Sequence, residues 1–342
     1  MPDSDIPDEG LTVAVTGPTG DIGKSVVRAL EREPHVGRIV GMARRPFDPA
    51  DHGWERAEYV RGDILDRASV ARLVDGADVV VHLAFVIFGN EEETRRVNLE
   101  GSRNVFEAAV DAGAKRLVYT SSVAAYGFPE KPGLLTEEDE PRGTDRFYYS
   151  AQKAELEAAL RETLARSATD AYVFRPCVVA GADAPEIIRQ LVDTIRLGGR
   201  LDPLARLLGR IPGAKPVLPD PGIEFQLVHH DDVADAIAAA VVGRGRPGAY
   251  NLAGPGELGP PDLARELGWR SAWVPRRGVG VLAELLGRVP MLPAKVAWLN
   301  AFRTPVVMDM SKAREELGWE PRHDALETLR ETIAASRKAG LI

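Results

Sequence analysis

Three glycines spaced three residues apart follow a short apolar run near the start of the chain. The run ends at Thr16, and the glycines are Gly17, Gly20 and Gly23. Gly17 permits a tight turn after a strand, Gly20 lets backbone amides approach a pyrophosphate, and Gly23 lets a helix pack closely on the strand. The first turn of such a helix presents unpaired N–H groups to phosphate oxygens. The pattern therefore predicts a strand, a glycine turn and a helix that together hold a dinucleotide.

Strand and helix signals alternate through the first half of the chain. The predicted strands are 38–42, 59–61, 79–84, 116–121 and 172–175, and the predicted helices are 21–31, 67–74, 92–112 and 149–166. This alternation is typical of a doubly wound parallel sheet with helices on both faces. The predicted fold class is therefore α/β and Rossmann-type, with a smaller and mostly helical substrate lobe.

The length of the chain predicts two lobes. The expected parts are a dinucleotide-binding domain at 11–175 that takes back residues 224–253, a substrate-binding lobe at 176–223 and 254–342, and a loose tail at 1–10. Proline and glycine are dense at 198–222. The stretch 278–302 is apolar but is interrupted by prolines, so we expect a lid or the face of a homodimer there.

Composition excludes several classes of partner. The chain has 342 residues and a formal net charge of −8, whereas nucleic acids and anionic membranes select clustered positive charge. Its single cysteine, Cys177, excludes an intramolecular disulfide and fits a reducing compartment. Residues 1–10 lack the apolar core of a signal peptide, and the most apolar run, 79–88, is too short to span a bilayer. We expect a cytoplasmic enzyme with a small-molecule substrate and no nucleic-acid or membrane partner.

A tyrosine and a lysine lie four residues apart on one face of the predicted helix at 149–166. The pKa of a free tyrosine is about 10, so Tyr149 alone is a poor base at neutral pH. Lys153, together with the positive nicotinamide of an oxidised cofactor, would lower that pKa. Ser122 lies at the end of a predicted strand, where its hydroxyl can donate to a carbonyl oxygen while Tyr149 transfers the proton. These three residues are the predicted catalytic set.

With these motifs in this order, the chain resembles the extended short-chain dehydrogenase/reductase family, which includes NAD-dependent epimerases and dehydratases. The resemblance rests on residues 16–23, Asp63-Ile64, 82–84, Asn98, the catalytic set and a closing helix at 311–319. It implies an NAD(P)-dependent dehydrogenase, reductase or epimerase, in which the helix asparagine supports the active site. The cofactor-binding residues that it implies are Gly17, Thr19, Gly20, Asp21, Ile22, Gly23, Asp63, Ile64, Leu83, Ala84, Asn98, Tyr149, Lys153, Pro176 and Val178.

The departures from the family pattern concern the substrate. The resemblance implies that nucleotide-sugar epimerases carry an asparagine at the place of Val178 and an arginine at the place of Phe225, and neither residue here can bind a diphosphate. Sugar dehydratases have an Asp-Glu pair where this chain has Val123 and Ala124. We therefore expect neither a nucleotide sugar nor a dehydration.

Aromatic and aliphatic side chains are expected around the substrate. They are residues 85–88, Phe128, Phe147 and Phe225. A pocket with few fixed polar groups suits a hydrophobic carbonyl or alcohol. The alternative is that these side chains pack between the two lobes.

The choice of cofactor depends on the end of the second predicted strand. An NAD site usually has an acid there that binds the ribose hydroxyls. This chain has Arg44 and Arg45 instead, whose guanidinium groups can bind a 2′-phosphate. We therefore favour NADP(H) over NAD(H), although two solvated loop arginines are the alternative.

Two other features are expected to be structural. Residues 229–232, His-His-Asp-Asp, are metal-ligand types, but neighbours on a strand point to opposite faces, so no metal site is expected. Asp231 or Asp232 is expected to cap a helix that begins at Val233. Cys177 follows a buried strand and is expected to be a small core residue rather than a nucleophile.

Taken together, the sequence predicts an oxidoreductase that moves a hydride between NADP(H) and a secondary alcohol or ketone. The first alternative is an epimerase, which oxidises and re-reduces one carbon without net turnover of the cofactor. A third hypothesis is a non-catalytic dinucleotide sensor, but such a protein has no need of the acid/base set at Ser122, Tyr149 and Lys153.

Overall fold

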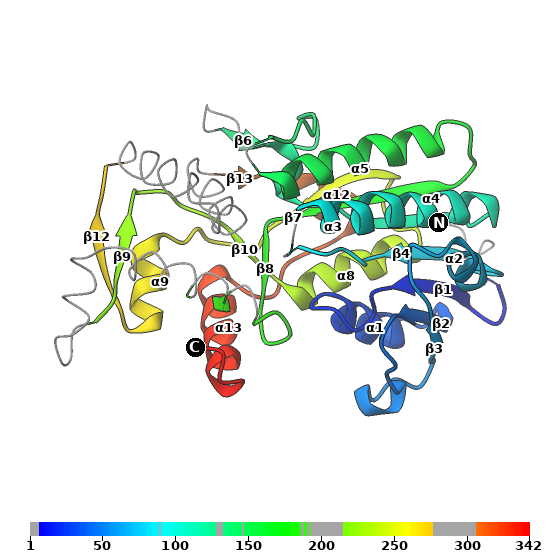
Figure 1. Cartoon of the computed structure of the whole chain (residues 1–342), viewed down its shortest axis with the longest axis horizontal. Coiled ribbons are helices and arrows are strands. Elements are labelled where there is room, and N and C mark those ends of the chain that lie inside the picture. Colours follow the sequence, from blue (N-terminus) through cyan, green and yellow to red (C-terminus); the bar gives the residue numbers. More distant parts are fainter. Residues whose placement is uncertain are drawn as a thin grey trace.

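The computed structural model describes residues 7–87, 89, 91–127, 133–145, 147–185, 188–189, 192, 215–275 and 306–342. Four sequence predictions lie outside these residues: Phe88, Phe128, most of the stretch 198–222, and the lid or dimer face at 278–302. A larger lobe surrounds the main sheet, and a smaller lobe with α9 (Pro260–Leu267) and α13 (Ala325–Lys338) lies at one side of it (Figure 1).

Seven parallel strands form the main sheet, in the order β3-β2-β1-β4-β5-β7-β11. The strands are β1 (Leu11–Thr16), β2 (Val36–Ala43), β3 (Ala57–Arg61), β4 (Val79–His82), β5 (Arg116–Thr120), β7 (Asp170–Pro176) and β11 (Gly248–Leu252). The order reverses between β1 and β4, which makes the sheet doubly wound. The predicted fold class is therefore confirmed, and a ligand crevice is expected where β1 and β4 end.

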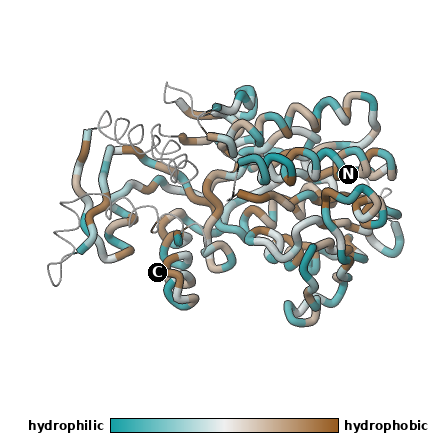
Figure 2. The backbone as a smooth tube through the Cα atoms, viewed as in Figure 1, coloured by the Kyte–Doolittle hydropathy of each residue, from teal (hydrophilic) through white to brown (hydrophobic). Residues whose placement is uncertain are grey.

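Alternate residues of β1 contact different helix layers. Val13 and Val15 pack with α1 (Gly23–Arg32) and α8 (His230–Val241). Ala14 packs on the other face with α2 (Arg67–Val74), α4 (Gly101–Asp111) and α5 (Tyr148–Leu164). Along these helices hydrophilic and hydrophobic residues alternate, as in amphipathic helices (Figure 2). Burial on both faces explains why the strands are continuous apolar runs.

The helix predicted at 92–112 is divided into three parts. α3 (Glu91–Arg95) and α4 are joined by a π-helical turn at Arg96–Glu100. Asn98 lies in this turn and is fully buried. A widened turn is a common device for aiming a side chain at a functional site.

Short strand pairs and helices make up the rest of the described chain. β8 (Val178–Ala180) pairs with β10 (Leu227–His229), β9 (Val217–Asp220) with β12 (Arg270–Trp273), and β6 (Leu134–Leu135) with β13 (Val307–Met308). β11 returns to the main sheet as predicted, whereas β10 pairs with β8 outside it. α12 (Ser311–Leu317) forms within the closing helix predicted at 311–319. No helix in the described part of the chain is both long and apolar enough to cross a bilayer.

The helix after β10 begins earlier than predicted. α8 starts at His230, and its N-cap is His229, whose ring accepts a hydrogen bond from the Asp231 backbone N–H at 3.2 Å. The predicted cap at Asp231 or Asp232 was therefore wrong. Asp232 is buried and instead accepts backbone N–H groups of Arg322 and His323, at 3.0 and 3.2 Å, which fastens the C-terminal segment to α8.

The glycine turn between β1 and α1 is closely packed. Gly17 has φ of +72°, in the left-handed region that favours glycine. A Cβ at Gly23 would lie 2.1 Å from the Gly17 carbonyl oxygen, whereas a Cβ at Gly20 would keep an ordinary 3.4 Å from that atom. The first helical turn therefore approaches the strand end more closely than any side chain would permit.

Gly23→Ala is expected to lower the free energy of unfolding by about 2 kcal/mol or more, because its methyl group overlaps backbone that cannot easily move. Gly20→Ala is the matched control and should change that free energy by about 1 kcal/mol or less. Denaturant unfolding of the three proteins measures both effects. Equal stability of Gly23→Ala and the unmodified protein would contradict the described packing.

Candidate active site

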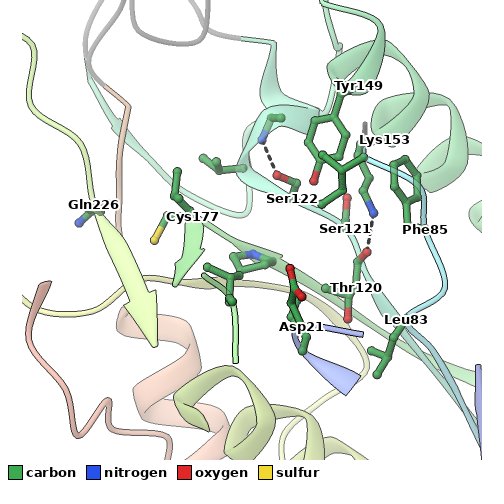
Figure 3. A pocket seen from close by; sticks show the side chains of 18 of the residues that line it. Asp21, Leu83, Phe85, Thr120, Ser121, Ser122, Tyr149, Lys153, Cys177 and Gln226 are labelled. Carbon is green, nitrogen blue, oxygen red and sulfur yellow. Dashed lines mark hydrogen bonds between the residues drawn. The ribbon is translucent and has the colours of Figure 1, made fainter. Parts of the chain in front are cut away.

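A pocket with a volume of about 510 Å³ lies at the carboxyl ends of β1, β4, β5 and β7. Eleven of the predicted site residues line it: Gly17, Gly20, Asp21, Ile22, Gly23, Leu83, Ser122, Tyr149, Lys153, Pro176 and Val178. They come from segments far apart in the sequence, and the parallel topology brings them to one edge of the sheet. Figure 3 shows several of them around the cavity.

The three predicted catalytic side chains meet in this pocket. Ser122 follows β5 and caps a short 3₁₀ helix, with its Oγ accepting the Ala124 backbone N–H at 3.2 Å. Tyr149 lies in the first turn of α5 and is hydrogen-bonded to Ser122. Lys153, one turn further along α5, donates from Nζ to the Thr120 carbonyl oxygen at 2.8 Å. The structure therefore places a phenol, a hydroxyl and an ammonium group side by side (Figure 3).

Burial controls the protonation of the tyrosine and the lysine. It raises the pKa of Tyr149 to about 12, and the hydrogen bond with Ser122 acts in the opposite direction. Burial lowers the pKa of Lys153 to about 7, against the favourable charge of Glu157. Among the protein's own groups, desolvation of the phenolate therefore outweighs the nearby charges. The predicted lowering of the Tyr149 pKa included the charge of an oxidised nicotinamide and stays a prediction. Lowering it requires the further positive charge that an oxidised nicotinamide would bring.

A buried ion pair lies behind the catalytic side chains. Arg175 on β7 donates from Nε and Nη2 to the two carboxylate oxygens of Glu157 on α5, at 3.0 and 2.7 Å. Ser121 donates to the same carboxylate at 2.6 Å, and Arg175 also donates to the Tyr126 hydroxyl at 2.8 Å. The pair therefore fixes α5 and the end of β5 relative to each other.

The glycine end of the pocket fits a dinucleotide. The close approach of Gly23 to Gly17 leaves backbone, without side chains, at the N-terminus of α1. The Thr120 hydroxyl is buried in the pocket wall and has no hydrogen-bond partner among the described residues. Such a hydroxyl is available to a bound ligand. Thr120 was missed by the sequence analysis, although its place at the end of a strand was a usable signal.

Four predicted residues lie at the neighbouring strand ends, outside the pocket. Arg44 and Arg45 follow β2, and Asp63 and Ile64 follow β3, with Ala43 and Arg61 in register. Both arginines are exposed, and no carboxylate of the described residues pairs with either guanidinium group. Asp63 accepts the Leu65 backbone N–H at 3.0 Å, as a turn residue does, and Ile64 is buried. Their contacts with a cofactor stay predictions.

The remaining predicted cofactor residues have supporting positions. Thr19 lies in the glycine turn, and Ala84 packs against Gly17 and donates its N–H to Thr16 Oγ1 at 3.2 Å. Asn98 is 0% exposed, and its amide bonds the Val86 backbone N–H at 2.8 Å and carbonyl at 2.9 Å. Direct contact of Asn98 with a cofactor does not agree with this placement, because its side chain is enclosed. It supports the segment after β4, as the resemblance implied.

The substrate side of the pocket is mainly apolar. Its apolar lining includes Phe85, Val86, Ile87, Val123, Ala124, Phe147, Val178, Val179, Ile223, Phe225 and Val306. Val178, Phe225, Val123 and Ala124 thus face the cavity at the positions where nucleotide-sugar enzymes were expected to carry polar residues. Cys177 also lines the pocket, and burial raises the pKa of its thiol, which disfavours the nucleophilic thiolate. Gln226 is a buried polar residue of the lining that the sequence analysis missed.

A second group of polar side chains lies away from the pocket. Ring nitrogens of His229 and His230 and a carboxylate oxygen of Glu331 lie within 4.8 Å of one another. His229 Nδ1 accepts the Asp231 N–H, which leaves Nε2 protonated and 3.1 Å from Glu331. His230 Nε2 accepts the Asp183 N–H at 3.1 Å. These bonds occupy the lone pairs that a metal ion would need, so the prediction that this motif binds no metal is kept.

Comparison with known proteins identifies the family. The sequence model of the family described as "NAD dependent epimerase/dehydratase family" matches residues 13–253 of this chain. The uncharacterized protein y4nG of Sinorhizobium fredii is 29% identical over 94% of this chain and 77% of its own length. Human 3 beta-hydroxysteroid dehydrogenase type 7 is 34% identical over 56% of this chain and 56% of its own length. The chain spans only about a third, 31%, of several longer curated relatives.

The solved structures agree in fold. DesIV, a dTDP-glucose 4,6-dehydratase from Streptomyces venezuelae with NAD and TYD bound, superposes with a TM-score of 0.71. It is 24% identical, and the match covers 96% of this chain and 97% of DesIV. The extent of the family match, over most of the chain, decides the assignment. This protein belongs to the NAD-dependent epimerase/dehydratase family, whose members are NAD-dependent dehydrogenases, epimerases and dehydratases.

Proposed function

We propose that the protein transfers a hydride between NADP(H) and an apolar secondary alcohol or ketone. The observation that carries the proposal is the meeting of Ser122, Tyr149 and Lys153 at the wall of a pocket whose other side is apolar. A phenol that is hydrogen-bonded to a serine and lies near a buried lysine is suited to exchange a proton with a substrate oxygen.

Each side chain has one task in the oxidative direction. Tyr149, as phenolate, accepts the hydroxyl proton of the alcohol. Ser122 holds the substrate oxygen by a hydrogen bond, and Lys153 stabilises the phenolate by its charge. The chemistry that a bound NADP⁺ would supply is acceptance of the hydride from the carbinol carbon. In the reductive direction Tyr149 returns the proton to the oxygen of the ketone.

The walls of the pocket favour a hydrophobic substrate. Val178 and Phe225 offer no hydrogen bond or positive charge to a diphosphate. The relative named 3 beta-hydroxysteroid dehydrogenase type 7 acts, by its name, on a hydroxyl of a large apolar ring system. A hydroxysteroid or a similar apolar secondary alcohol is therefore the first class of compound to test.

Tyr149→Phe is expected to lower turnover by about 100-fold or more, because it removes the proton carrier. It should leave cofactor affinity nearly unchanged. Lys153→Met should lower both turnover and cofactor affinity, since it removes a charge beside the phenol and a predicted ribose contact. The test uses NADP⁺ with a panel of apolar secondary alcohols, including hydroxysteroids, and follows the absorbance of the reduced nicotinamide.

Tyr148→Phe is the matched control for this series. It removes a phenolic hydroxyl from the preceding residue of α5, where the Tyr148 hydroxyl donates to the Ile87 carbonyl oxygen at 3.0 Å. This variant should keep most of its turnover. Substantial activity in Tyr149→Phe would mean that another group carries the proton, and would overturn the proposal.

NADPH is expected to bind at least about tenfold tighter than NADH, a difference of about 1.4 kcal/mol. The exposed guanidinium groups of Arg44 and Arg45 can bind the 2′-phosphate, and Arg44→Ala combined with Arg45→Ala should abolish the preference. Arg38→Ala is the control, since Arg38 lies at the other end of β2 and pairs with Glu58. Calorimetric titration measures all affinities, and equal affinities in the unmodified protein would contradict the proposed cofactor.

An epimerase or dehydrogenase of nucleotide sugars is the second candidate. The likeness to DesIV, a dTDP-glucose 4,6-dehydratase, favours it. The apolar residues Val178 and Phe225 oppose it, so UDP and dTDP are expected neither to raise the melting temperature nor to compete with the substrate. Thermal shift and calorimetry test this expectation. Micromolar binding of either nucleotide would place the second candidate first.

A further inference from the structure

The Lys153 ammonium is buried and has few polar partners. Only 3% of the residue is exposed. Nζ donates to the Thr120 carbonyl oxygen at 2.8 Å and lies 3.4 Å from the Tyr119 hydroxyl. In the part of the chain that the structure describes, no carboxylate forms an ion pair with it. A charged amine in such surroundings needs further stabilisation to remain protonated.

The carboxylate whose charge acts on Lys153 from the same helix already has strong partners. Glu157 follows Lys153 by one turn of α5, but both of its oxygens accept hydrogen bonds from the guanidinium group of Arg175. Ser121 donates to it as well. Its negative charge is therefore largely balanced by Arg175, and only a part of it acts on Lys153.

An aromatic ring supplies the missing partner. Nζ of Lys153 lies 3.7 Å from the ring centroid of Phe85, over its face. The same ring meets Tyr149 edge-on, with centroids 5.5 Å apart and an interplanar angle of 88°. Figure 3 shows Phe85 beside the lysine, at the wall of the pocket. A desolvated ammonium over a ring face is a favourable cation–π contact.

We infer that Phe85 is a positioning residue: the face of its ring keeps the buried Lys153 amine as an ammonium ion and holds it beside Tyr149. The inference rests on the proposed function only for its effect on turnover. Its effect on the charge of Lys153 is a property of the free protein.

Four other titratable groups lie around Lys153. They are Tyr149 and Glu157 on α5, Tyr119 on β5 and His82 on β4. Burial, with the charge of Lys153, lowers the pKa of His82 to about 3, and burial raises the pKa of both tyrosines. Glu157 forms a buried ion pair with Arg175. A titration near neutral pH at this place therefore reports the lysine.

The test measures the pKa of Lys153 by the ¹³Cε chemical shift in lysine-labelled protein without cofactor, with the signal assigned through Lys153→Met. Burial already lowers this pKa to about 7. Phe85→Leu keeps an apolar side chain but removes the ring face, and is expected to lower the pKa by about one unit, a tenfold change in the ratio of charged to neutral amine. Phe147→Leu is the matched control, because the Phe147 ring lies 5.5 Å from that of Tyr149, whereas the ring closest to Lys153 Nζ among the described cation–π contacts is that of Phe85. It should leave the pKa unchanged.

A second variant separates the effect of the negative ring face from the effect of side-chain volume. A ring-fluorinated phenylalanine at position 85 keeps the shape and weakens the negative face, so it should also lower the pKa of Lys153. It tests whether the ring face raises the pKa of Lys153 even if Phe85→Leu does not fold. An unchanged or raised pKa in either variant overturns the inference.

Turnover gives an independent reading. If the proposed function is right, the alkaline limb of the pH profile, where Lys153 loses its proton, moves to lower pH in Phe85→Leu and stays in place in Phe147→Leu. A shifted lysine pKa without any hydride transfer would support the inference and refute the proposed function. Hydride transfer by the protein together with an unshifted lysine pKa in Phe85→Leu would support the proposed function and refute the inference.

Discussion

The buried ion pair of Arg175 and Glu157 holds the active site together. Arg175 comes from β7 and Glu157 from α5, and the pair also binds Ser121 after β5 and Tyr126 in the 3₁₀ helix. Removing one member would leave an uncompensated charge in the interior, which is far more costly than replacing both. Through this pair, the helix that carries Tyr149 and Lys153 is fixed against the strand end that carries Ser122.

The same pair determines the electrostatics of the pocket. Because Glu157 is engaged by Arg175, the Lys153 ammonium depends mainly on a carbonyl oxygen, a phenol and the face of Phe85. The lysine and Tyr149 therefore have pKa values shifted in opposite directions by the same cause, the loss of water.

Much of the fold and of the catalytic set could be predicted from the sequence, because the signals are local or follow from topology. The three glycines define one turn, and Tyr149 and Lys153 share a helix face by their spacing. Parallel strands bring Ser122 and the glycines to one sheet edge.

The errors concern features that depend on tertiary contacts. The π-helical turn around Asn98 and the start of α8 at His230 depend on which side chains find partners in the folded protein. The contact of Phe85 with Lys153, which was not predicted, depends on how the segment after β4 lies against α5. No spacing in the sequence reports these quantities.

A crystal structure with bound NADP⁺ tests the central claim most directly, since it shows where each end of the dinucleotide lies. The account predicts the pyrophosphate at the turn formed by Gly17, Gly20 and Gly23, and the nicotinamide in the pocket beside Tyr149 and Ser122. A dinucleotide bound elsewhere, or one whose nicotinamide lies away from Tyr149, would contradict it.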